Sequence, residues 1–138
     1  MGSKVALLDT SAIVAYMVRT DKFHLWAVSV FKTLPSSIAT CESVISECYH
    51  LLGKEKGGGE LLSEMLNRGI VSVVPLSSEI PALIRLIEKY EDLPMSFADA
   101  CLVRMAELNP NAVIVTADSD FRTYRINKNR KIPLLSPL

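Results

Sequence analysis

Acidic residues follow two of the apolar runs in this sequence. Asp9 comes directly after the apolar run at 4–8, and Asp118 and Asp120 follow the β-branched run at 112–115. The carboxyl ends of parallel strands share one edge of a sheet, where ligands bind in open α/β folds. Asp9 and Asp118 should therefore be neighbours if their strands are adjacent. Each also precedes a predicted helix, and either residue taken alone is more simply explained as a helix N-cap.

Two further carboxylates lie on predicted helices. Glu47 is at the border of the apolar face of a helix at 41–52, where it could equally reach out to solvent. Asp99 completes a capping-box pattern that begins at Ser96, yet its neighbours on a helical wheel are apolar. A buried carboxylate needs a partner, because an unpaired buried charge is costly. No Lys or Arg is nearby in sequence to supply one, whereas a metal ion would.

Four carboxylates in one pocket would repel one another, and a divalent cation between them resolves this. All-oxygen ligation suits Mg²⁺ or Mn²⁺, and these ions activate water and stabilise a developing phosphate charge. The chemistry predicted for Asp9, Glu47, Asp99 and Asp118 is therefore metal-dependent hydrolysis of a phosphodiester. The sequence shows no P-loop, dinucleotide-binding glycine motif, nucleophile elbow or zinc-ligand spacing that would favour another reaction.

Strands and helices must alternate to position these acids. We predict strands near 4–8, 70–74, 112–115 and 132–135, and a brief one at 36–39. Helices are predicted at 12–18, 21–34, 41–52, 61–67, 78–90, 96–108 and 119–124. This alternation predicts an α/β fold, with a parallel sheet covered by helices on both faces. The length of 138 residues fits a single domain, 1–138.

Composition and charge limit the classes of protein. With 49% hydrophobic and 22% charged residues the chain is a compact globule, and no apolar run approaches the ~20 residues of a membrane helix. The formal net charge is zero, which gives no support for a nucleic-acid partner. The C-terminal segment nevertheless gathers basic residues with no acid among them. On charge alone this segment is a solvated turn, and the alternative is a rim that contacts phosphates. Its basic residues are Arg122, Arg125, Lys128, Arg130 and Lys131.

The remaining reactive side chains do not form a motif. Cys41, Cys48 and Cys101 are an odd number without C-x-x-C spacing, so we expect reduced, buried thiols in a cytoplasmic protein and no zinc site. The first four residues lack the features of a secretory signal. The isolated His24 and His50 are expected in the core or on the surface.

One predicted helix, 21–34, has little polar face. It carries apolar side chains on nearly every side, from Phe23 to Phe31, and we expect Asp21 to cap it. Such a helix is either packed on both sides within the domain or partly buried by another chain. The periodicity of the sequence does not favour one of these two alternatives over the other.

Four segments together resemble the PIN-domain ribonucleases, and in particular the VapC-like toxins of toxin–antitoxin pairs. The resemblance extends over nearly the whole chain in the order of the family, and the four segments are specific only together. They are Leu7-Leu-Asp-Thr-Ser-Ala12, Val44-Ile-Ser-Glu47, Pro94-Met-Ser-Phe-Ala-Asp-Ala100 and Val115-Thr-Ala-Asp-Ser-Asp-Phe121.

The resemblance implies a three-layer α/β/α sandwich with a central parallel sheet of four to five strands. It also implies Mg²⁺- or Mn²⁺-dependent cleavage of RNA, a homodimer, and an antitoxin partner that lies on the helical surface, of which 23–31 would be a part. The metal would be held by Asp9, Glu47, Asp99 and Asp118, with Asp120 assisting. Thr10, Ser11 and Thr116 would support them, and Arg122 and Arg125 are candidates to hold the RNA backbone.

Two other functions fit parts of the pattern. The first is a catalytically silent PIN-fold module that binds RNA or protein, with the acids acting only as helix caps. The complete set of acids argues against it. The second is a phosphatase or phosphotransfer domain, which ranks last because no nucleophile motif follows the first strand.

Overall fold

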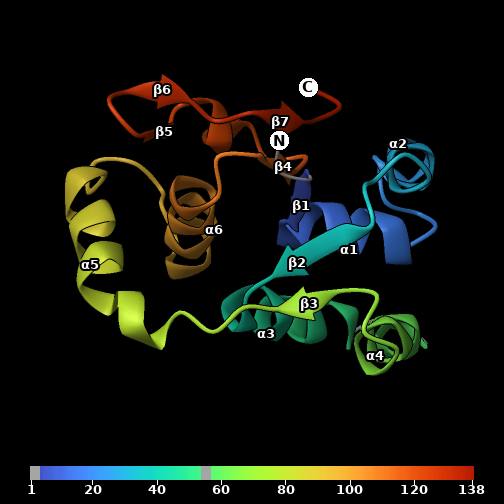
Figure 1. The fold of residues 1–138 in the computed structure, drawn as a ribbon. Helices are drawn as coiled ribbons and strands as arrows, with labels where there is room; N and C mark the ends of the chain where they lie inside the picture. Colours follow the sequence, from blue (N-terminus) through green and yellow to red (C-terminus); the bar gives the residue numbers. More distant parts are fainter. Residues whose placement is uncertain (1–3, 54–56) are drawn as a thin grey trace.

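A five-stranded parallel sheet forms the centre of the protein. The computed structural model describes residues 4–53 and 57–138, so residues 1–3, considered above for a secretory signal, lie outside the described part. The strand order is β3-β2-β1-β4-β7, and every neighbouring pair is parallel, which confirms the predicted sheet (Figure 1). The strands are β1 (Val5–Leu8), β2 (Ser37–Thr40), β3 (Ser72–Val73), β4 (Ala112–Val115) and β7 (Leu134–Leu135).

Helices cover the sheet on both sides, which confirms the three-layer sandwich. Figure 1 shows α5 and α6 on one side and α1, α2 and α4 on the other. The α-helices are α1 (Thr10–Met17), α2 (His24–Phe31), α3 (Glu42–Leu52), α4 (Gly58–Asn67), α5 (Ile80–Lys89) and α6 (Phe97–Leu108). Two 3₁₀-helices, η1 (Ser77–Glu79) and η2 (Ser119–Arg122), precede α5 and follow β4. Among the described residues, no helix has the length and apolar character needed to cross a membrane.

The centre of the sheet and helix α6 form the core. Ala6, Leu7 and Leu8 of β1 are fully buried, as expected for a strand between two others. Helix α6 is buried on most of its surface, because it packs against both α5 and the strands β1 and β4. Asp99, on the first turn of α6, is therefore held in a largely buried position.

The order of the strands creates a crevice at the carboxyl ends of β1 and β4. From β1 the chain crosses to β2 and β3 on one side, and it then returns past β1 to β4 on the other. Leu8 pairs with Val115 at the end of the two strands, and the backbone N–H of Asp9 donates to the carbonyl of Val115 at 3.1 Å. Such a reversal of strand order is where open α/β sheets bind ligands. The expected adjacency of the strands before Asp9 and Asp118 is confirmed.

Helix α2 is shorter than predicted and is not packed on both sides. It begins at His24 with Phe23 as its N-cap, so the prediction that Asp21 caps it was wrong. The carboxylate of Asp21 instead accepts from the N–H of Phe23 in the turn before the helix. Phe31 stacks on Tyr16 of α1 with ring centroids 4.2 Å apart, whereas Leu25 is 83% exposed. Within the described chain α2 therefore leaves an apolar surface toward solvent, which favours the alternative of burial by another chain.

Several predicted boundaries were wrong for local reasons. Helix α1 begins at Thr10, before the predicted start at 12, because Asp9 is its N-cap. Helix α4 begins at Gly58, before the predicted start at 61, and the turn of η2 is 3₁₀ rather than α. The outer strands β3 and β7 are only two residues long. The basic turn contains a small antiparallel pair, β5 (Arg125–Ile126) and β6 (Arg130–Lys131).

Candidate metal centre

Asp9 lies at the end of β1, and its carboxylate is held by three donors. Its Oδ1 accepts from the N–H of Thr10 at 2.8 Å, and its Oδ2 accepts from Ser11 Oγ at 2.8 Å and Thr116 Oγ1 at 2.6 Å. The side chain is only 5% exposed. Burial raises the pKa of Asp9 to about 6, although the hydrogen bonds from Thr116 and Ser11 act in the opposite direction.

The hydroxyls of Ser11 and Thr116 also fix the loop that follows β4. Thr116 Oγ1 accepts from the N–H of Asp118, and Ser11 Oγ accepts from the N–H of Ala117, both at 2.9 Å. Each hydroxyl thus joins the carboxylate of Asp9 to the backbone before Asp118. This is a positioning role at the residues for which the sequence predicted support.

Asp99 faces the same crevice from the first turn of α6. The predicted capping box is present: Ser96 Oγ accepts from the N–H of Asp99, and Asp99 Oδ2 accepts from the N–H of Ser96. The same Oδ2 accepts a 3.0 Å hydrogen bond from the phenol of Tyr124. Burial raises the pKa of Asp99, with a smaller contribution from the charge of Asp118, and the bond from Tyr124 lowers it. Sequence reasoning missed Tyr124, because nothing local in the sequence links it to Asp99.

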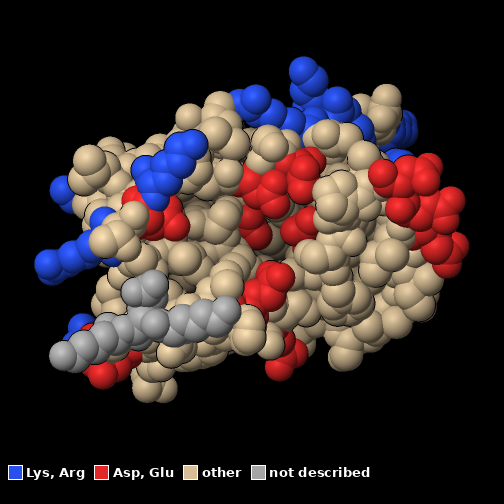
Figure 2. All heavy atoms as spheres, turned by 180° about the vertical axis from the view of Figure 1, so that it is seen from behind, with Lys and Arg blue, Asp and Glu red and all other residues tan. Residues whose placement is uncertain are grey.

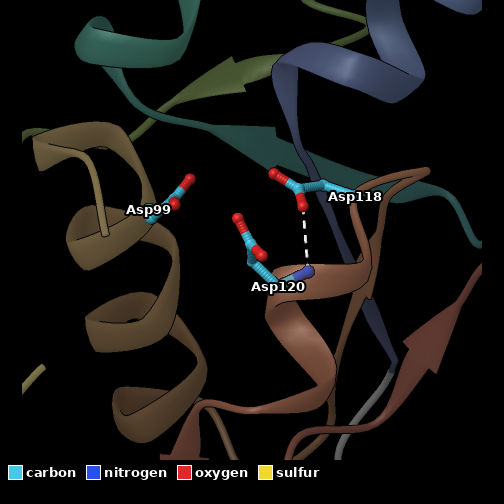
Figure 3. Close-up of side chains that lie close together, drawn as sticks. All are labelled: Asp99, Asp118 and Asp120. Atoms are coloured by element: carbon cyan, nitrogen blue, oxygen red, sulfur yellow. Dashed lines mark hydrogen bonds between the residues drawn. The ribbon is translucent and has the colours of Figure 1, made fainter. Parts of the chain in front are cut away.

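Asp99, Asp118 and Asp120 form the tightest group of carboxylates, and we refer to them as the aspartate trio. Each offers an oxygen within 4.8 Å of the other two. Figure 3 shows the three side chains directed toward a shared space, Asp99 from α6 and the other two from the segment that follows β4. Asp118 Oδ1 accepts from the N–H of Asp120 at 2.9 Å. Asp120, which the sequence ranked as an accessory, is therefore one of the three residues whose oxygens lie within 4.8 Å of one another.

Asp9 and Glu47 border the same hollow without belonging to the trio. A pocket of about 320 Å³ is lined by Asp9, Glu47, Asp99 and Asp118. Glu47 is exposed, and its Oε1 accepts from Thr10 Oγ1 at 2.8 Å. All four acids predicted for the metal site therefore face one pocket, with Glu47 at its outer rim.

The charges in this pocket have no basic partner within the part of the chain that the structure describes. The ion pairs there are Arg68–Glu64, Arg104–Glu79 and Arg104–Glu107. Burial, with a smaller contribution from the charge of Asp118, also raises the pKa of Asp120. Close carboxylate oxygens without an ion pair fit a hard divalent cation such as Mg²⁺ or Mn²⁺. The trio would hold it, with Asp9 and Glu47 within the same pocket.

The two arginines predicted to hold RNA differ in their surroundings. Nη1 of Arg125 donates to the carbonyls of Arg122, Thr123 and Tyr124, and its backbone N–H donates to the phenol of Tyr90. Arg125 thus fixes the end of η2, and its RNA contact stays a prediction. Arg122 is exposed. Figure 2 shows acidic side chains around a hollow in the middle of one face and basic side chains along the edge above it.

Cysteine and histidine do not contribute to this centre. The three cysteines are free and buried, as expected. Nδ1 of His24 lies 2.8 Å from the carbonyl of Ala15. Among the described residues, the one cluster able to hold a metal consists of aspartates only.

Comparisons with known proteins agree with this geometry. A family model described as PIN domain matches residues 6–127. VapC20 of Mycobacterium tuberculosis, described as a Sarcin-Ricin loop cleaving toxin, is 19% identical with a TM-score of 0.75, over 86% of this chain and 93% of that chain. A chain of VapBC2 from Rickettsia felis, bound to a DNA fragment from its promoter, is 16% identical with a TM-score of 0.64. The match covers 96% of this chain and 98% of that chain. No curated protein matches by sequence.

Proposed function

The chain belongs to the PIN domain family, and from this premise we propose that it is a Mg²⁺- or Mn²⁺-dependent endoribonuclease. The observation that carries the proposal is the aspartate trio, with oxygens within 4.8 Å of one another. Two of its members, Asp99 and Asp118, line a pocket together with Asp9 and Glu47. A divalent cation bound there would supply a more acidic water and a positive charge beside the phosphate. In the reaction the water oxygen bonds to phosphorus, the phosphorus–ester bond breaks, and a proton passes to the leaving oxygen.

The residues of this chain would orient the reacting groups. Ser11 and Thr116 hold the carboxylate of Asp9 against the loop before Asp118. Tyr124 and the capping box hold one oxygen of Asp99, so that its other oxygen is left toward the pocket. Carboxylates that are fixed before the substrate binds need no reorganisation during the reaction, which is the main contribution of a preorganised polar site.

We further propose that the protein is the toxin of a toxin–antitoxin pair, acts in the cytoplasm and forms a homodimer. Support comes from the fold it shares with VapC20 and with a chain of VapBC2, from its three cysteines, which form no disulfide, and from the exposed apolar surface of α2. An antitoxin would suppress cleavage by covering the helical surface and reaching into the acidic pocket.

The test compares wild type with Asp99→Asn. Wild type should cleave RNA with Mn²⁺ and stop when a chelator is added. Asp99→Asn should lose at least about 100-fold in rate while its circular dichroism spectrum stays native. The matched control is Asp92→Asn, which changes an exposed aspartate after α5 and should cleave like wild type. Equal rates for Asp99→Asn and wild type would remove the site assignment, and a folded wild type that binds RNA without cutting it would favour the silent module.

A further inference from the structure

We propose that a second cleft, between Arg122 and Lys131, holds the RNA backbone beside the metal centre; this inference rests on the proposed ribonuclease function. The cleft has a volume of about 250 Å³ and is lined by Phe121, Arg122, Lys131, Ile132 and Leu134. Its walls therefore carry two cations and its floor is apolar. Sites that bind single-stranded nucleic acid use such a positively charged groove to follow the phosphates of the backbone.

Both cations are available for a ligand. Arg122 and Lys131 are exposed, and the hydrogen bonds and ion pairs among the described residues give neither side chain a partner. Nη1 of Arg125, by contrast, already donates hydrogen bonds to three backbone carbonyls. We therefore assign a phosphate contact to Lys131, which the sequence had only placed within a basic run.

The two walls of the cleft are fixed to each other. Arg122 ends η2, and its carbonyl accepts from Arg125 of β5. Strand β5 pairs with β6 so that Arg125 is opposite Lys131. The next residue, Ile132, is buried and ties the hairpin to the core. A cleft held by backbone and core contacts is already formed before a ligand arrives.

The position of the cleft favours RNA, rather than an acidic protein segment, as its ligand. Arg122 lies two residues after Asp120, on the same 3₁₀-turn that carries the trio's third carboxylate. Figure 2 shows the basic edge directly above the acidic hollow. An RNA strand can place one phosphate at the cation and another in the basic cleft. An acidic peptide that continued from the cleft would instead bring carboxylates against Asp118 and Asp120.

The experiment measures binding apart from cleavage. A short fluorescein-labelled single-stranded RNA is titrated in EDTA, and the anisotropy is followed at about 50 to 200 mM salt. The test variant is Arg122→Gln/Lys131→Gln. The control is Arg19→Gln/Lys32→Gln, which neutralises two exposed cations, one at each end of the segment that contains α2, and Figure 1 places α2 away from β6. Melting curves check that both variants are folded.

We expect the test variant to bind RNA about tenfold or more weakly at the lowest salt. Its slope of log affinity against log salt should be shallower by about 1.4, because each phosphate contact on a single strand contributes about 0.7. The control should match wild type. Two results would overturn the proposal that the cleft binds RNA: an affinity and slope of the test variant equal to those of wild type, or no binding of RNA by wild type. Either result counts whether or not the wild type cleaves RNA with Mn²⁺. Tight binding of an oligoglutamate peptide but not of RNA would also overturn it. The ribonuclease proposal is tested separately, by the cleavage assay with Mn²⁺.

Discussion

The phenol of Tyr124 donates a 3.0 Å hydrogen bond to Oδ2 of Asp99 inside the protein. Tyr124 is fully buried, and its ring packs edge-on against Tyr90 and Phe121, with centroids 5.2 and 5.4 Å away. The C-terminal segment thus sets the orientation of a carboxylate that α6 carries. The bond stabilises the charged form of Asp99 in a place where burial opposes it.

Tyr124→Phe should move the acidic limb of the pH–rate profile upward. The substitution keeps the ring but removes a bond that lowers the pKa of Asp99, so the carboxylate loses its proton only at higher pH. The rate should fall more at about pH 6 than at about pH 8, with a stability loss of about 1 kcal/mol. The control is Tyr90→Phe, which removes a bond to Arg125 in the same aromatic cluster and should leave the profile in place. Identical profiles for all three proteins would contradict a positioning role for Tyr124.

The metal-free protein should lose stability through Asp9 as the pH rises. Burial raises the pKa of the folded carboxyl to about 6 from the ordinary 3.8. Below pH 4 the group is protonated in both states. Between pH 4 and 6 only the folded state keeps the proton, so the free energy of unfolding falls, in total by about 3 kcal/mol. Urea unfolding in EDTA at several pH values should show a smaller fall for Asp9→Asn. If Asp9→Asn and wild type follow the same pH dependence, the pKa of Asp9 is not raised.

Divalent cations should stabilise the folded protein through the aspartate trio. A ligand at one hundred times its dissociation constant adds about 2.7 kcal/mol to the free energy of unfolding. Asp118→Asn and Asp120→Asn should each lose most of the rise in melting temperature that Mn²⁺ causes. Glu47→Gln should retain more of that rise, because Glu47 lies outside the trio, at the exposed rim of the pocket. A full Mn²⁺-induced rise in Asp120→Asn would return that residue to the accessory role predicted from the sequence.

Leu25→Ser should weaken the proposed homodimer at least about tenfold without loss of stability. The side chain is 83% exposed on α2, so the isolated chain gains little from it. Light scattering after size-exclusion chromatography measures the mass over a range of concentrations. Leu108→Ser, at the half-exposed end of α6, is the matched control and should behave like wild type. A monomeric wild type would refute the dimer.

Local signals in the sequence were enough to predict the sheet and the four acids that line one pocket. The apolar runs that end at Asp9 and before Asp118 define adjacent strands, and the Ser96–Asp99 box marks the start of a helix on its own. Contacts between distant segments were not predictable. Tyr124 meets Asp99 only after the chain has passed through β4 and η2. The uniformly apolar residues around α2 show no helical period from which its ends could be read.

The hairpin β5–β6 was missed for a different reason. Its turn places Asn127, Lys128 and Asn129 at positive φ, a conformation for which glycine is the usual signal. Asparagine tolerates it through local hydrogen bonding, but Lys128 gives no hint of it. For the same reason the sequence showed only a run of basic residues where the structure has one wall of a cleft.

The two-residue length of β3 and β7 has a consequence for how this protein meets other chains. They are the edge strands of the sheet. Edge strands this short offer few free N–H and C=O groups to an incoming strand. Growth of the sheet from one molecule into the next, the route to fibrous aggregates, is therefore poorly templated. Selective association is left to the helical surfaces, where side chains rather than backbone decide the partner.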